Sequence, residues 1–185
     1  MKDRSDLTDS SKHPQSTAFL LAQIGAHAAM QFSERLGQIG LVPVQAGILR
    51  TVAANSGLSQ QTLAKRLGIV PSRLVTLLDE LEEKGLLERL DHAEDRRLYA
   101  LALTDKGMKV MADIGRIARA HDDGLCAALA PAERRQLWSL LVRIAEEQRL
   151  EAGVHPGFSR LGGSGSKEVA SEKGKAAARG RVPRP

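Results

Sequence analysis

Apolar side chains between about residue 16 and residue 150 recur at steps of three and four, the spacing that places them on one face of a helix. The first such segment extends from about residue 16 to Leu36, where two glycines interrupt the pattern. Pro43 follows and suits the first turn of a second helix, because its missing N–H has no intrahelical partner there. The pattern thus predicts two helices before Asn55.

Two shorter helices follow, joined by a tight turn. Ser59 is a suitable N-cap for a helix over residues 60–67, and Gly68 stands where a left-handed residue usually ends a helix. Pro71 opens the next helix, which Gly85 ends. Its leucines follow the i, i+3, i+4, i+7 pattern of a single buried stripe: Leu74, Leu77, Leu78 and Leu81.

The periodicity then changes to two. The runs LLERL and LYALAL are typical of short strands, and the polar stretch DHAEDRR between them predicts a hairpin tip. Thr104 is a suitable cap for a fifth helix over residues 105–130, and Pro131 opens a sixth. The sequence therefore predicts a mainly α fold of six helices with a small two-stranded β wing, the arrangement of a winged helix-turn-helix.

The exposed side of the helix opened by Pro71 carries the first candidate chemistry. With the leucine stripe buried, its N-terminal part presents Ser72, Arg73 and Thr76, whose hydroxyls and guanidinium are suited to base edges or phosphates. The C-terminal part is acidic, so we expect it to point away from a nucleic-acid duplex. Lys65 and Arg66 on the preceding helix are further candidates for phosphate contacts.

The hairpin tip supplies a second set of candidates. Arg96 and Arg97 stand at the tip, and an extended arginine there can enter a narrow minor groove, where the negative potential is concentrated. Asp95 is positioned to orient one of them through a charge-assisted hydrogen bond. Both sets can also be read as ordinary solvated surface charges.

The body of the chain resembles the MarR family of bacterial transcription regulators. The resemblance covers about residues 16–150 and rests on LVPVQAGILR, on LSQQTLAKRLGIVPSRLVTLLDELEEKGLLER, and on the wing DRRLYALALTDKG. Val70 departs from the family pattern, which often places Ser or Asp before the proline that opens this helix. The departure predicts a helix start without a side-chain cap, at a cost of about 1 kcal/mol.

The resemblance implies a homodimer that binds a pseudo-palindromic operator on double-stranded DNA, represses transcription and is released by a small-molecule effector. It implies a helical dimerisation domain from residues 16–40 and 105–150, and a winged helix-turn-helix DNA-binding domain from residues 41–104. A terminal pair of helices with apolar faces independently favours a partner copy that covers them. His27, Phe32 and Arg50 are weak candidates to line a cavity for an aromatic effector, although core packing explains Phe32 equally well.

The two ends of the chain differ from the body in composition. Residues 1–15 are polar, and residues 156–185 are rich in Gly, Ser, Lys and Arg, so we expect a disordered N-terminal arm and a disordered basic tail. Up to residue 155 the 20 Lys and Arg balance the 20 Asp and Glu, whereas the last thirty residues hold 7 against 2. The alternative function is therefore nonspecific or architectural DNA binding through this tail.

Other function classes have little support. The chain has no run of about 18 apolar residues, and its polar opening differs from a signal peptide, so we expect a cytoplasmic protein without membrane contact. The single cysteine, Cys126, excludes an internal disulfide framework, and the histidines form no convincing metal-ligand set. Glycine loops that bind phosphate or dinucleotide cofactors are absent, as is a nucleophile with its base, so we expect neither enzymatic activity nor a cofactor or metal.

Overall fold

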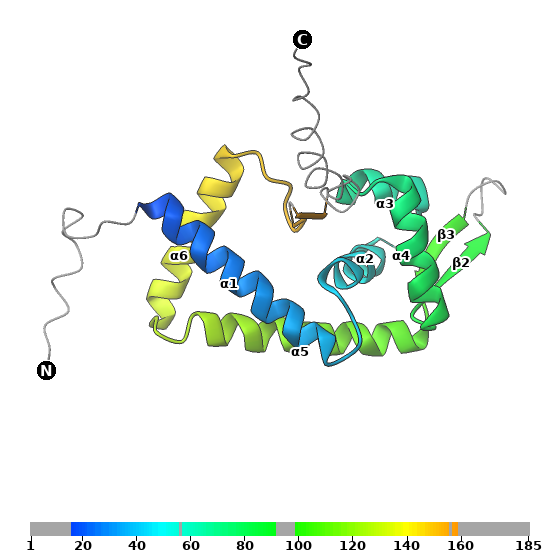
Figure 1. Ribbon diagram of the computed structural model, residues 1–185, viewed down its shortest axis with the longest axis horizontal. Helices are drawn as coiled ribbons and strands as arrows, with labels where there is room; N and C mark the ends of the chain where they lie inside the picture. Colours follow the sequence, from blue (N-terminus) through cyan, green and yellow to red (C-terminus); the bar gives the residue numbers. More distant parts are fainter. Residues whose placement is uncertain (1–15, 56, 92–98, 156, 159–185) are drawn as a thin grey trace, which may run out of the picture.

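The computed structural model describes residues 16–55, 57–91, 99–155 and 157–158 of the 185-residue chain. It contains six helices, as the sequence predicts (Figure 1). They are α1 (Thr17–Gly37), α2 (Pro43–Ala54), α3 (Gln60–Leu67), α4 (Pro71–Glu83), α5 (Asp105–Leu125) and α6 (Pro131–Glu147). Helix α5 is shorter than expected, because the chain leaves the helix at Cys126 and becomes extended at Ala130, before Pro131.

The wing contains one strand more than the predicted pair. Strands β2 (Leu87–Asp91) and β3 (Tyr99–Leu103) form the antiparallel hairpin, and β1 (Leu58–Ser59) pairs with the other edge of β3. The sheet order is β1-β3-β2. A two-residue strand has no measurable period, so its pairing depends on tertiary contacts that a sequence pattern does not contain.

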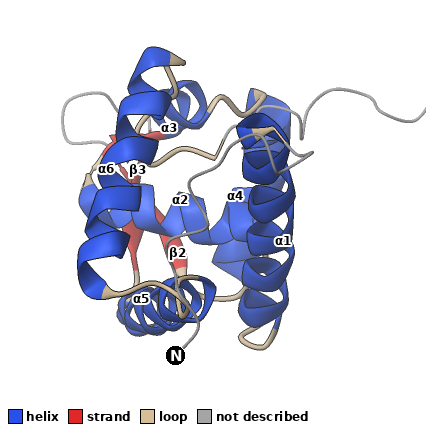
Figure 2. Ribbon diagram, turned by 90° about the vertical axis from the view of Figure 1, so that its left-hand side faces the viewer, coloured by secondary structure: helices blue, strands red, loops and turns tan. Residues whose placement is uncertain are grey.

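The elements form two lobes joined by α5. Helices α1 and α6 lie with one half of α5, and α2, α3, α4 and the sheet gather at its other half (Figure 1). Viewed from the side, α1 and α6 stand on opposite sides of the view with α5 seen end-on below (Figure 2). The long α5 therefore connects the predicted dimerisation lobe to the winged lobe.

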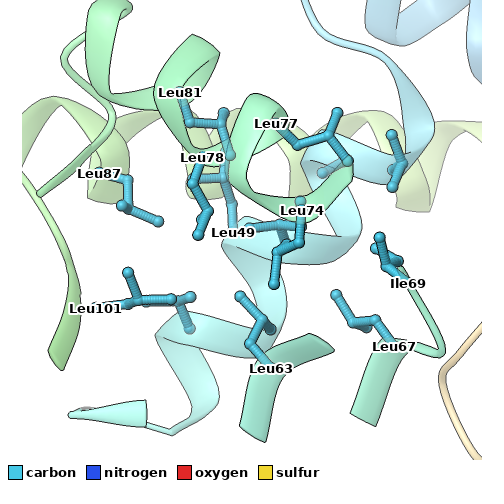
Figure 3. Packing of buried hydrophobic residues seen from close by; sticks show 14 of the residues in the cluster. Leu49, Leu63, Leu67, Ile69, Leu74, Leu77, Leu78, Leu81, Leu87 and Leu101 are labelled. Atoms are coloured by element: carbon cyan, nitrogen blue, oxygen red, sulfur yellow. The ribbon is translucent and has the colours of Figure 1, made fainter. Parts of the chain in front are cut away.

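The core of the winged lobe is a layer of leucines beneath α4. The four stripe leucines of α4 are at most 1% exposed and pack over side chains from α2, α3 and the sheet (Figure 3). Full burial of each such side chain contributes about 1.5–3 kcal/mol. The partners labelled with them are Leu49, Leu63, Leu67, Ile69, Leu87 and Leu101.

Helix α4 begins as its sequence predicts. Val70 offers no side-chain hydrogen bond, Pro71 occupies the first turn, and the Leu74 N–H donates to the Val70 carbonyl at 3.0 Å. The N-terminal N–H groups of α4 thus have no side-chain acceptor from the cap residue.

Thr104 joins the wing, α4 and α5. Its hydroxyl accepts from the Gly107 N–H at 3.0 Å, which caps α5, and donates to the Gly85 carbonyl at 2.7 Å. Gly107 lies so close to this turn that a Cβ there would meet the Leu86 carbonyl oxygen at 2.0 Å. The absence of a side chain at this position allows α5 to begin directly against the end of α4.

We expect Gly107→Ala to lower the free energy of unfolding by about 3 kcal/mol, because the new methyl group collides with backbone that cannot move aside. Gly115→Ala in the same helix is the matched control. Its Cβ would meet only the Arg119 guanidinium at 3.6 Å, so the substitution should raise stability by up to about 1 kcal/mol. Urea unfolding at one protein concentration measures both, and equal effects would contradict this account of Gly107.

Candidate nucleic-acid interface

The N-terminal half of α4 presents a small polar surface. Ser72 and Thr76 are exposed one turn apart, with Arg73 half-buried beside them. The Thr76 hydroxyl lies 3.4 Å from the Ser72 carbonyl oxygen, which orients it along the helix. Val75, which the sequence analysis did not single out, lies on the same side and is 39% exposed. An exposed valine beside two hydroxyls can supply an apolar contact to a thymine methyl group.

The acidic half of α4 is tied to the neighbouring sheet. Arg89 of β2 donates to Asp79 Oδ1 at 2.6 Å and also to Glu82 Oε2, so one guanidinium bridges two carboxylates. Its side chain is 18% exposed. Arg89 is not among the site residues predicted from the sequence, although its place two residues after the buried Leu87 puts both on one face of the strand.

A buried amide fixes α4 to the start of α2. Gln45 is 2% exposed, and its Nε2 donates to Glu80 Oε2 at 2.8 Å. Its Oε1 accepts from the Val42 N–H at 3.3 Å and from Lys84 Nζ at 3.2 Å. Lys84 Nζ also donates to the Gly40 carbonyl at 2.8 Å. These bonds satisfy a buried polar side chain and set the position of α4 relative to the α1–α2 turn.

The remaining candidates flank α4 on two sides. Lys65 and Arg66 are exposed in the last turn of α3, and Arg66 donates to Asn55 Oδ1 at 2.8 Å. Asp95, Arg96 and Arg97 lie outside the described residues, in the segment that connects Asp91 to its strand partner Tyr99. The structure therefore brings the basic residues of α3 and the exposed part of α4 into one winged lobe.

A cavity of about 340 Å³ lies between α1, α2 and α5. Phe32 and Arg50, two of the predicted ligand residues, are in its wall. His27 is exposed on α1 and is not part of that wall. Further lining residues come from beyond α6: Gly153, His155 and Phe158. The cavity thus has aromatic walls and one guanidinium, and part of its wall comes from a segment the sequence analysis did not place there.

Beside the cavity wall, Phe32 contacts a histidine of α5. The ring centroids of Phe32 and His121 are 5.4 Å apart, and His121 Nδ1 is buried without a hydrogen-bond partner among the described residues. Burial, assisted by the charge of Arg35, lowers the pKa of His121 below its ordinary value. The neutral form of His121 is therefore the form that this packing favours.

Within the described ranges, no helix is long and apolar enough to cross a membrane. Nor do three His, Cys, Asp or Glu side chains come together there in a group able to hold a metal ion.

Comparison with known proteins places this architecture among transcription regulators. The family model described as MarR family matches residues 39–98. A putative transcriptional regulatory protein for the hcr operon of Thauera aromatica is 38% identical over 105 residues, which span 57% of this chain and 63% of that protein, just under two thirds of its length. The transcriptional regulator FarR of Neisseria gonorrhoeae is 32% identical over 116 residues, covering 63% of this chain and 80% of FarR.

A solved structure extends the similarity to nearly the whole folded body. The transcriptional repressor CouR, bound to a 23-mer DNA duplex, is 33% identical and superimposes with a TM-score of 0.63. The alignment covers 70% of this chain and 92% of the CouR chain. The similarity therefore includes both lobes of a related repressor.

Proposed function

This chain belongs to the MarR family of DNA-binding transcription regulators, and we propose that it binds a pseudo-palindromic operator as a homodimer and represses transcription until a small molecule binds. One observation carries the proposal: α4 exposes Ser72, Val75 and Thr76 on the side opposite its buried leucine stripe. Hydroxyl, apolar and guanidinium groups on a helix held rigidly from behind are suited to reading a major groove.

The charge distribution along α4 supports one orientation on DNA. Arg89 and Gln45 hold its acidic C-terminal half against the protein, so the N-terminal half with Arg73 faces the duplex. Lys65 and Arg66 of α3 then contact phosphates, and Arg96 and Arg97 of the wing enter the adjacent minor groove, with Asp95 orienting them. Residues 41–104 form the DNA-binding domain in this proposal.

The proposed dimer follows from the uncovered faces of α1 and α6. Phe19 and Ile24 of α1 are 52% and 51% exposed, and Trp138 and Ile144 of α6 are 69% and 44% exposed. Helix α6 has no buried residue at all. Apolar surface of this extent favours association with a second copy, through residues 16–40 and 105–150. Two-fold symmetry then places the two α4 helices at half-sites about 10 bp apart.

The proposed effector site is the cavity between the lobes. Phe32 supplies an aromatic wall and Arg50 a positive charge, which suits a small aromatic molecule with an anionic or phenolic group. A ligand there releases DNA only if it binds more tightly to the lobe arrangement that mismatches the operator. His27 is not part of this proposal, because it lies outside the cavity wall.

We expect Arg73→Ala to weaken binding to the DNA upstream of its own gene about ten- to hundredfold, since a lost base or phosphate contact costs about 1–3 kcal/mol. Arg116→Ala is the matched control, because Arg116 is an exposed arginine on α5, away from α4. Fluorescence anisotropy with this duplex and a scrambled one gives both affinities. The proposal fails if neither duplex is preferred, or if the two variants behave alike.

We expect Ile144→Glu to convert a dimer into a monomer at micromolar concentration, because a carboxylate would be buried in the apolar interface without a partner. Leu90→Glu is the control, since Leu90 is 47% exposed on β2 and lies outside the residue ranges of the proposed interface. Sedimentation equilibrium distinguishes the two states. A monomeric wild-type protein would remove the dimer from the proposal.

Deletion of residues 159–185 separates the proposal from nonspecific binding through the basic tail. The deletion removes all seven basic residues of the last thirty. We expect the ratio of affinities for the upstream and scrambled duplexes to stay unchanged, while the salt slope becomes shallower if the tail contacts phosphates. Loss of all binding in the truncated protein would instead support the tail-dependent alternative.

A further inference from the structure

The chain beyond α6 turns back onto the winged lobe. Helix α6 ends when Arg149 takes a left-handed conformation at φ 54° and the Leu150 N–H donates to the Ala145 carbonyl at 2.9 Å. The following segment crosses from the end of α6 to α2, in the middle of Figure 1. We name residues 150–155 and 157–158 the C-terminal strap.

An arginine of α2 holds the middle of the strap. The Arg50 guanidinium donates to the Gly153 carbonyl oxygen. Gly153 has φ +73°, and a Cβ there would lie 3.4 Å from both terminal nitrogens of Arg50. Glycine suits this position because it adopts the left-handed conformation without strain and leaves room for the guanidinium. Val154, next in the chain, packs against the hydrophobic core.

The end of the strap places a phenyl ring in the core. Phe158 is 8% exposed, and its ring occupies the space where a side chain at Gly47 would begin, with Cε2 2.8 Å from that Cβ position. The Phe158 N–H donates to the His155 carbonyl at 3.0 Å, and the two rings lie 5.6 Å apart. Gly47 thus lets a ring from outside the helical body rest directly on the backbone of α2.

We propose that the C-terminal strap competes with ligands for the effector cavity. Phe158 occupies the space that an aromatic ligand would fill, and the Gly153 carbonyl accepts from the Arg50 guanidinium that would bind the ligand. The same cavity wall contains Phe32, Arg50, Gly153 and Phe158. A ligand that takes the whole site must displace the strap, so its apparent affinity is lowered by the fraction of molecules in which the strap is bound.

The strap also connects the two lobes, since it begins at α6 and ends on α2. Its release by a ligand removes a restraint between the proposed dimerisation lobe and the DNA-binding lobe. This regulatory role rests on the proposed effector release. The competition between Phe158 and a ligand does not rest on effector release, and it can be tested separately.

The test uses benzoate, a phenyl ring with one carboxylate, as the probe for the full-length protein. We expect Phe158→Ala to bind benzoate at least tenfold more tightly than the wild type in calorimetry. Gly47→Ala should do the same, because its methyl group displaces the far end of the Phe158 ring while the strap is otherwise intact. The matched control is the protein lacking residues 159–185, which retains the strap and should bind benzoate as the wild type does.

A second measurement tests the proposal even if the Phe158→Ala protein does not fold. With 4-fluorophenylalanine at position 158, the ¹⁹F resonance of the otherwise wild-type protein should move toward the position of a solvent-exposed ring as benzoate is added. Unchanged or weaker benzoate binding in both folded variants overturns the proposal. A fluorine resonance that stays in place at saturating benzoate, or no benzoate binding by any variant, also overturns it.

Operator binding distinguishes this proposal from the proposed function. If the variants bind benzoate more tightly but benzoate never changes the affinity for the upstream duplex, the strap occupies the cavity and effector release is wrong. If benzoate weakens operator binding equally in wild type and variants, effector release stands and the proposal that the strap competes with the ligand is overturned.

Discussion

The buried leucine layer beneath α4 is the constraint on which the rest of the structure depends. Because the four stripe leucines are almost fully excluded from solvent, the helix can present only one side, and that side begins with Ser72 and Thr76. A helix that rotated to expose a leucine would lose about 1.5–3 kcal/mol for each side chain uncovered. The hydrophobic core thus determines which residues of α4 are exposed, and these are the residues that the proposed function assigns to DNA contact.

Polar contacts then set the direction of that exposed side. The bridge from Arg89 to Asp79 and Glu82 offsets the negative charge at the far end of α4 and holds it to the sheet. Gln45 fixes the C-terminal half of α4 through Glu80, and Thr104 holds the end of the helix close to α5. These side chains come from α2, the sheet and the start of α5, so direct contacts connect α4 to each of these elements.

The cavity lies between α1, α2 and α5, and the C-terminal strap forms part of its wall. Helix α2 belongs to the winged lobe, whereas one half of α5 belongs to the other lobe. The strap extends from α6 to α2 and so connects the same two lobes. In the proposed regulator, a ligand and the strap compete for one slot, and the outcome changes how firmly the lobes are held together. The energy available for this switch is limited to the difference in affinity between the two states.

Local patterns in the sequence were sufficient for the six helices, because each has a strong period together with a proline, glycine or hydroxyl residue at its ends. The leucine stripe likewise determined which side of α4 is exposed. Strand β1, the bridging role of Arg89 and the burial of Phe158 were decided only by the tertiary structure. Phe158 stands alone in a polar segment expected to be a disordered tail, yet it is buried because Gly47, 111 residues earlier, leaves room for its ring. A periodic pattern reports only on neighbours along the chain, whereas these three features depend on partners that folding brings together.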